Sequence, residues 1–355
     1  MDRAVVFMNP VPSKSPQISC FKFIRVISPY FEKISVISSS LDDNEDADIY
    51  NVKYKKQSNK ILRVLNFLWF QLKVFFLSMS KLQKGDCAFF WVGDKMFSSM
   101  FACKLKGAKT YFFLYGITSL ENDSKKAMTT KKGQDFLASK ADFLCCESPS
   151  VLADRGIEMN ENVKVIHLYV DDLGCSDNKK STVGMLCRVA SGKCVLESIE
   201  AFSRFHSTHP EYTLDIVGDG ILFDECKKLI EKLNAESYIA MRGWMLHEDL
   251  FSLMENWQLL LFPTKTEGLP NSVLESMSMS VPALCSPVGG LKDLIKDKEN
   301  GYFLKNEDVD TIYHALCDVI ESGTLKNVCK NAKETINNEY TLENARLNFK
   351  SQMGF

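Results

Sequence analysis

Short runs of β-branched, aliphatic and aromatic residues alternate along this chain with longer stretches that have the hydrophobic spacing of helices. This alternation is typical of parallel βα units. In the first half, six apolar runs predict strands at residues 4–8, 34–38, 87–92, 110–115, 143–146 and 163–167. In the second half, six more predict strands at residues 183–187, 213–217, 238–242, 259–262, 283–285 and 302–304. The acidic stretch at residues 42–48 is predicted to be a loop.

The chain is long enough for two domains, because 355 residues exceed what one hydrophobic core normally holds. The polar, glycine-containing segment at residues 171–181 is a natural linker. It places one domain at residues 1–172 and a second at residues 173–335. We therefore predict an α/β protein with two doubly wound sheets that face each other across a cleft, because open α/β sheets bind ligands at the carboxyl ends of their strands.

Positive charge is concentrated in the first half, although the net charge of the whole chain is only −2. Residues 1–175 carry 24 Lys and Arg against 19 Asp and Glu, whereas the remainder carries 19 against 26. Between Lys53 and Lys140, 17 basic residues occur with 5 acidic ones. This asymmetry indicates either an anionic partner, such as a membrane surface or a phosphorylated acceptor, or a set of solvated lysines. We expect no nucleic-acid partner.

Residues 61–82 form the most apolar stretch, ILRVLNFLWFQLKVFFLSMSKL, but they contain Arg63 and Lys73 and are flanked by further lysines. These charges make the stretch a poor membrane-spanning segment. The pattern predicts a helix that either lies at a membrane interface or packs in the core of its own domain.

The chain has no signature of a metal site or of export. Its 12 cysteines include no CxxC pair and no His–Cys cluster with zinc spacing. No signal-peptide pattern precedes the first strand, so we expect reduced thiols in a cytoplasm, with the protein peripheral on the inner face of a membrane. The triplets Asp46–Ala–Asp48 and Asp308–Val–Asp310 look like metal-binding motifs, but one is predicted in an acidic loop and one at a helix start.

Candidate chemistry is concentrated in the segment EGLPNSVLE, in which Glu267 and Glu275 are eight residues apart. The segment follows an apolar strand and precedes a helix that begins near Pro270. Gly268 permits a close approach of the backbone to a ligand. The first amides of the helix, from Asn271 to Val273, would form an anion site that suits a diphosphate. The alternative is a capping box, because Ser272-Val-Leu-Glu275 also has that pattern and would need no ligand.

The segment resembles the E-x7-E signature of retaining glycosyltransferases of family 4, which have the GT-B fold. The resemblance extends in order over residues 140–345. The segment VGMLCRVASGK resembles the diphosphate-binding element, LDIVGDG and RGWM resemble the next two elements, and VIHLYVDD resembles the interdomain element. The fold implied is GT-B, with a C-terminal helix at residues 336–355 that crosses back to the N-terminal domain.

The resemblance implies that a nucleotide sugar, linked to UDP or GDP, donates its sugar to a glycan or lipid-linked acceptor without a metal or other cofactor. Arg188 and Lys193 would neutralise the departing diphosphate, while Glu267 would bind the donor sugar and Glu275 the ribose. The donor phosphate would take the proton of the acceptor, so that no protein nucleophile is needed. The residues implied in donor binding are Gly218, Arg242, Gly268, Leu269, Pro270, Asn271, Ser272, Glu275, Tyr115 and Gly116.

The first half departs from the family pattern at two places. The loop after the first strand, residues 9–14, lacks the usual glycines, and Tyr115 stands where relatives often have a histidine near the donor sugar. Two alternatives therefore remain: a nucleotide-sugar epimerase of the same fold, and a catalytically silent binding or scaffold protein. A nicotinamide-dependent enzyme is disfavoured, because no GxGxxG motif follows a first strand.

Overall fold

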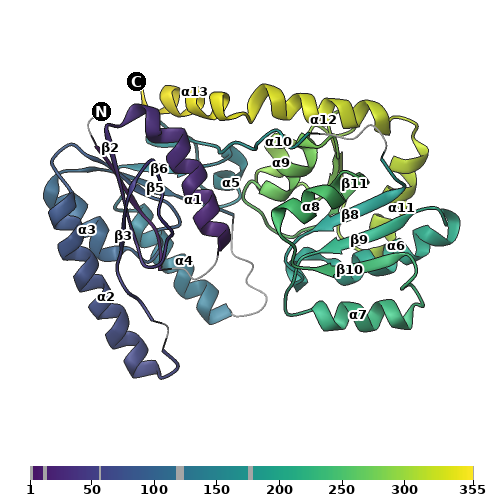
Figure 1. Ribbon diagram of the computed structural model, residues 1–355, viewed down its shortest axis with the longest axis horizontal. Coiled ribbons are helices and arrows are strands. Elements are labelled where there is room, and N and C mark those ends of the chain that lie inside the picture. The colour runs from purple at the N-terminus through teal and green to yellow at the C-terminus, as the bar shows by residue number, and fades with distance from the viewer. Residues whose placement is uncertain (1–2, 11–13, 56, 117–123, 175–178, 355) are drawn as a thin grey trace. The chain divides into compact units, whose positions relative to one another are not determined.

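The computed structural model describes residues 3–10, 14–55, 57–116, 124–174 and 179–354. The chain divides into two compact units (Figure 1). The first contains Met1–Glu147, Gly156–Leu168 and Ala345–Phe355, and the second contains Ser148–Arg155 and Tyr169–Asn344. Parts of the predicted linker (175–178) and of the loop after the first strand (11–13) lie outside the described residues.

The first unit contains a parallel sheet of seven strands in the order β3-β2-β1-β4-β5-β6-β7. Consecutive residues of its central strands are buried, which means that both faces of the sheet are covered. The strands are β1 (Arg3–Phe7), β2 (Lys33–Ser38), β3 (Asp48–Asn51), β4 (Cys87–Phe90), β5 (Lys109–Phe113), β6 (Phe143–Cys146) and β7 (Val163–Val165). The helices are α1 (Lys14–Ile27), the short η1 (Ser28–Tyr30), α2 (Lys60–Lys81), α3 (Phe97–Lys106), α4 (Ser124–Ala138) and the last helix α13 (Leu342–Met353).

The end of the chain is part of the core of the first unit. Phe349 of α13 lies with its ring centroid 6.3 Å from Phe23 of α1 and 6.0 Å from Phe89 of β4. The hydroxyl of Tyr30 donates a hydrogen bond of 2.9 Å to the carbonyl of Arg346. The first unit is therefore completed by residues from both ends of the sequence.

The second unit contains a parallel sheet of six strands in the order β10-β9-β8-β11-β12-β13. Consecutive residues of β11, such as Leu259 and Leu260, belong to two different apolar clusters, one on each face of the sheet. The strands are β8 (Thr182–Leu186), β9 (Thr213–Val217), β10 (Ile239–Gly243), β11 (Trp257–Phe262), β12 (Ala283–Cys285) and β13 (Tyr302–Phe303). The helices are α5 (Pro149–Ala153), η2 (Ser191–Lys193), α6 (Val195–Thr208), α7 (Phe223–Lys232), α8 (His247–Met254), α9 (Asn271–Ser278), α10 (Leu291–Leu294), α11 (Val309–Glu321) and α12 (Leu325–Glu339).

All twelve predicted strands are confirmed, within a few residues at their ends. The structure adds β3, which the acidic composition before it concealed. Its four residues are polar or only partly buried, and they pair with β2 alone, at the edge of the sheet. Asp48 at its start forms an ion pair of 2.9 Å with Lys33. An edge strand of this kind has no apolar run that a sequence pattern detects.

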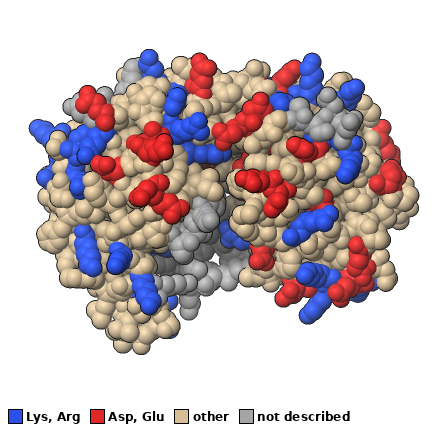
Figure 2. Space-filling model, in the orientation of Figure 1, with Lys and Arg blue, Asp and Glu red and all other residues tan. Residues whose placement is uncertain are grey.

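Helix α2 is attached to the first unit by one face only. Asn59 caps its start by accepting two backbone hydrogen bonds, and its buried residues are Phe70, Val74 and Ser78. Within the described residues, α2 is the one helix long and apolar enough to cross a membrane. Only 17% of its most apolar 18-residue window is buried, whereas a core helix would be mostly buried. The alternative of a core helix is therefore wrong. The surface around the free end of α2 is mainly uncharged on the face shown in Figure 2.

Candidate functional site

The strand order of the second unit defines where a ligand site is expected. The chain begins the sheet at β8, adds β9 and β10 on one side, and then returns to add β11 on the other side. Loops that leave β8 and β11 thus diverge at their carboxyl ends, which is the switch point where doubly wound sheets bind ligands. The predicted catalytic residues lie in these two loops.

A lysine and a glutamate meet at the switch point. Lys193 Nζ forms an ion pair with Glu267 Oε1, and it also donates to the Thr264 hydroxyl at 3.2 Å. That hydroxyl donates in turn to the same carboxylate oxygen at 3.1 Å. A backbone bond of 3.0 Å from Lys265 N to Gly192 O joins the loops. The structure thereby brings together two predicted residues that are 74 positions apart, with Lys193 23% and Glu267 13% exposed.

Arg188 lies exposed in the same loop as Lys193, held by the backbone on either side of it. The amides of Cys187 and Val189 donate to carbonyls at and after the end of β9, at 3.1 Å in both cases. This packing needs two glycines in the loop after β9. A Cβ at Gly218 would lie 1.9 Å from the Cys187 oxygen, and one at Gly220 would lie 2.2 Å from the Val189 oxygen. Loop packing thus explains why residue 218 is a glycine. Its contact with a donor stays a prediction.

Replacing Gly218 with alanine should destabilise the second unit, by roughly 2–4 kcal/mol of unfolding free energy. The residue has φ +130° and no room for a Cβ beside the Cys187 oxygen. Gly323→Ala is the matched control, because that glycine also has a positive φ, +68°, but meets nothing within 4 Å. The control should lose only about 1 kcal/mol. Urea unfolding of both variants tests this, and equal losses would refute the packing role.

The helix that follows the Glu267 loop begins at Asn271, with Pro270 as its N-cap. Proline has no side-chain acceptor, and no side-chain hydrogen bond is described at this cap. Ser272 is the second residue of the helix, so the capping-box alternative is wrong. The amide of Val273 donates to the Pro270 carbonyl at 3.1 Å, so the amides that the start of this helix can offer to an anion are those of Asn271 and Ser272. Glu275 lies further along the helix and is partly exposed.

A second pair of glycines, Gly289 and Gly290, packs against the backbone of the Glu267 loop. Gly290 N donates to Gly268 O at 2.8 Å. A Cβ at Gly289 would lie 2.1 Å from the Glu267 oxygen, so a larger residue would displace the loop. Leu269 is buried beside them. Through these contacts, Gly268 and Leu269 fix the position of the Glu267 carboxylate and of the start of α9.

Arg242 is the fourth residue of β10, and its side chain is bound to the neighbouring strand β9. Its Nε donates to Asp215 Oδ1 at 2.8 Å, and the other oxygen of Asp215 accepts from the indole of Trp257 at 3.2 Å. The side chain of Arg242 is 47% exposed. The structure thus gives Arg242 a partner inside the sheet, and its predicted contact with a nucleotide base stays a prediction.

Tyr115 and Gly116 follow β5 in the first unit. The ring of Tyr115 lies 5.7 Å from that of Trp91, edge to face, and 6.4 Å from that of Phe113. Burial raises the pKa of the Tyr115 hydroxyl well above its ordinary value. It therefore remains a neutral hydrogen-bonding group across the physiological range and lacks the proton chemistry of a histidine.

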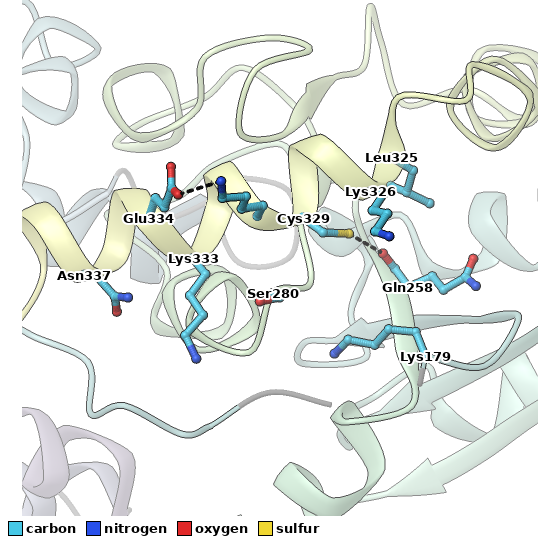
Figure 3. Close-up of a pocket in the computed structure, with 10 residues that line it drawn as sticks. Lys179, Gln258, Ser280, Leu325, Lys326, Cys329, Lys333, Glu334 and Asn337 are labelled. Carbon is cyan, nitrogen blue, oxygen red and sulfur yellow. Dashed lines mark hydrogen bonds and ion pairs between the residues drawn. The ribbon is translucent and has the colours of Figure 1, made fainter. Parts of the chain in front are cut away.

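A cavity of about 680 Å³ in the second unit lies at the opposite edge of the sheet (Figure 3). Gln258 near the start of β11 and Ser280 just before β12 line it, and parallel strands place such residues at the amino edge. Four lysines contribute to its wall, and Lys330 pairs with Glu334 at 3.5 Å. This cavity is not the switch-point site. The residues that line it are Lys179, Gln258, Ser280, Leu325, Lys326, Cys329, Lys330, Lys333, Glu334 and Asn337.

Comparison with known proteins agrees with this geometry. Residues 175–336 match the family described as Glycosyl transferases group 1. The chain is 26% identical over 134 residues to an Escherichia coli UDP-Gal:alpha-D-GlcNAc-diphosphoundecaprenol alpha-1,3-galactosyltransferase, a match that covers 38% of this chain and 34% of that protein. It is also 26% identical over 167 residues to a Campylobacter jejuni N-acetylgalactosamine-N,N'-diacetylbacillosaminyl-diphospho-undecaprenol 4-alpha-N-acetylgalactosaminyltransferase, covering 47% and 44%. The matches thus span less than half the length of these two relatives.

Among solved structures, HepE of Anabaena in complex with UDP superposes with a TM-score of 0.79 at 16% identity, and the match covers all of both chains. The fold of this protein is therefore GT-B, the architecture of two doubly wound α/β domains. Most of its second unit lies within the segment that is similar to glycosyl transferases group 1.

The residues that sequence reasoning missed are those that hold the site in place. Thr264 bridges Lys193 and Glu267, and the adjacent glycines of the segment PVGG support the Glu267 loop. A hydroxyl residue two positions after a buried strand was the available signal for Thr264, because that position lies at the carboxyl edge. Nothing in the sequence indicates by itself that the glycine pair packs beneath the loop.

Proposed function

We propose that this chain is a glycosyltransferase that moves a sugar from a nucleotide sugar to a glycan or lipid-linked acceptor. The observation that carries the proposal is the cluster of Lys193, Thr264 and Glu267 at the switch point, beside the start of α9. A cation, a carboxylate and leading helix amides are the groups that a sugar diphosphate requires. A scaffold protein has no need for a paired, mostly buried Lys193 at this edge.

UDP is the favoured nucleotide, and a polyprenyl diphosphate the favoured carrier of the acceptor. The Escherichia coli relative is named as a transferase that uses UDP-Gal and a diphosphoundecaprenol acceptor, and the Campylobacter relative is named for a diphospho-undecaprenol substrate. HepE was solved with UDP. Together they support a role in the assembly of surface polysaccharide or glycolipid, with the protein peripheral on the inner face of a membrane.

In the proposed reaction, the bond between the sugar and the diphosphate breaks and negative charge grows on the leaving oxygen. Lys193, Arg188 and the leading amides of α9 stabilise that charge. Contacts with Glu267 and Thr264 fix the ammonium group of Lys193 at the switch point before the donor binds. Glu267 accepts hydrogen bonds from sugar hydroxyls, and Glu275 accepts from the ribose. The acceptor hydroxyl attacks from the face of the leaving diphosphate, which takes its proton, so that the configuration is retained.

A thermal-shift panel of UDP- and GDP-linked sugars tests the proposal. A ligand at about a hundred times its dissociation constant adds about 2.7 kcal/mol to stability, so the correct donor should be clearly separated from the others. The stabilising donor is then incubated with and without a lipid diphosphate acceptor. Transfer that needs the acceptor supports the proposal, whereas inversion of the donor sugar without acceptor would identify an epimerase.

Transfer should persist in excess EDTA, because side-chain cations and helix amides neutralise the diphosphate in the proposed site. The measurement is the initial rate with and without chelator, after removal of divalent ions from the donor. Loss of activity that added magnesium or manganese restores would contradict this part of the proposal.

A further inference from the structure

The side of α2 opposite its buried face exposes large apolar residues from Ile61 to Phe76. Phe70, Val74 and Ser78 recur every fourth residue and form the buried face. The opposite face exposes large apolar side chains, such as Ile61 (71%) and Trp69 (56%). The exposed set on α2 is Ile61, Leu62, Val64, Leu65, Leu68, Trp69, Leu72 and Phe76.

The neighbouring helix α3 extends this surface. Phe101 and Leu105 of α3 are 60% and 57% exposed. The ring of Phe101 stacks on that of Phe75, with centroids 6.1 Å apart. We call the exposed apolar residues of α2, together with Phe101 and Leu105, the α2–α3 face. Ten large apolar side chains exposed on two adjacent helices are more than a soluble protein normally leaves uncovered together, which indicates a partner.

The charge around the α2–α3 face has one sign. Residues 49–85 contain no Asp or Glu and eight basic residues. Lys73 is exposed beside the apolar side chains, with its Nζ 5.2 Å from the centre of the Trp69 ring. Arg63 is exposed near the start of the helix. An apolar face that is rimmed by cations and contains an exposed tryptophan has the chemistry of the membrane interface.

Two other occupants fit the face less well. A second copy of the chain, packed face to face, would bring two sets of lysines together without carboxylates from this region to compensate them. A membrane span would remove α2 from the unit, although hydrogen bonds tie it to α3: the amide of Ser98 donates to Gln71 Oε1 at 3.0 Å, and Gln71 Nε2 donates to Lys95 O at 2.7 Å. A span would also expose the buried Phe70 and Val74.

We propose that the α2–α3 face inserts into the interface of an anionic lipid bilayer, with α2 parallel to the membrane plane and its lysines among the headgroups. The apolar side chains then leave water, and each nearby cation gains from the surface potential. Docking is a property of the first unit. Only the identity of the membrane, as the one that carries a lipid-linked acceptor, rests on the proposed function.

Tryptophan quenching tests the insertion, because the chain offers its own control. Trp69 on α2 is 56% exposed and Trp244 in the second unit is 66% exposed, whereas Trp91 and Trp257 are buried. The full chain is mixed with phosphatidylglycerol-containing vesicles whose acyl chains carry bromine. We expect quenching in the parent and in Trp244→Phe, and its loss in Trp69→Phe. Quenching that survives Trp69→Phe, or no quenching in the parent, would overturn the proposal.

A charge on the face provides the second test. Leu68→Glu should lower partition onto anionic vesicles by about tenfold or more, whereas Ile221→Glu, at a position 77% exposed in the second unit, should leave it unchanged. Binding of the parent should weaken as salt rises and be weaker on phosphatidylcholine alone. Equal partition of both variants, or a change of oligomeric state in place of vesicle binding, would refute membrane docking.

UDP binding, measured on the same samples, separates this inference from the proposed function. Leu68 lies in the first unit, outside the switch-point loops, so UDP binding should be unchanged in Leu68→Glu. Vesicle binding without UDP binding would contradict the proposed function alone. UDP binding without vesicle binding would contradict the docking alone.

Discussion

Replacing Lys193 with alanine is expected to slow sugar transfer by at least about a hundredfold, the effect of removing one charge-stabilising group from a reaction centre. The ammonium group is held at the switch point by Glu267 and Thr264, where the diphosphate of the donor is proposed to bind. The fall should lie in kcat as well as in kcat/KM, because the charge on the leaving diphosphate grows in the transition state. Steady-state rates with the donor identified by the thermal-shift panel measure it.

The Lys193→Ala variant also leaves Glu267, which is only 13% exposed, without its cation, so its stability must be measured beside its activity. Arg188→Ala avoids this difficulty, because Arg188 is exposed, and it should show a loss of the same kind. Lys232→Ala on α7, an exposed lysine away from the switch-point loops, is the matched control. If the Lys193→Ala variant folds and transfers sugar at the parental rate, the ion pair has no role in the reaction.

Glu267→Gln and Glu275→Gln should have different effects, although both replace a carboxylate by an amide of the same shape. If Glu275 contacts the ribose, its variant should bind free UDP several-fold more weakly, since ribose is common to donor and product. If Glu267 contacts the transferred sugar, its variant should bind UDP almost as the parent does, but turn over the nucleotide sugar about a hundredfold more slowly. Calorimetry with UDP and steady-state rates for both variants measure the two effects.

The structure removes one explanation that the sequence had left open for a silent Glu275→Gln variant. A capping box would make Glu275→Gln silent, because glutamine also serves at that position. The helix is capped at Pro270, however, and Ser272 lies inside it. A silent Glu275→Gln variant would now contradict the ribose contact itself. Weakened UDP binding in Glu267→Gln, as severe as in Glu275→Gln, would contradict the division of roles.

The two-sheet fold was predictable because parallel strands that are buried on both faces are continuous apolar runs, as in β4 and β11. The Lys193–Glu267 pair was predictable only as two separate motifs. Its geometry depends on the strand order, which brings loops 74 residues apart to one edge. The edge strand β3 was missed because pairing with one neighbour does not require apolar residues.

The exposed face of α2 shows what periodicity cannot decide. A core helix and an interfacial helix both have a wide apolar face. The sequence of α2 therefore allowed both, and the outcome depended on which face the rest of the unit covers. The sequence also did not indicate the partner of Arg242, which is the buried carboxylate of Asp215 on the neighbouring strand.

The proposed function requires that the switch point of the second unit bind a nucleoside diphosphate through its own cations. Calorimetric titration of UDP into the parent, Arg188→Ala and Lys232→Ala, all in EDTA, tests it most directly. We expect saturable binding in the parent and in Lys232→Ala, and binding at least about tenfold weaker in Arg188→Ala, which corresponds to 1.4 kcal/mol. Equal affinity of all three proteins for UDP, or no binding to the parent, would contradict the claim.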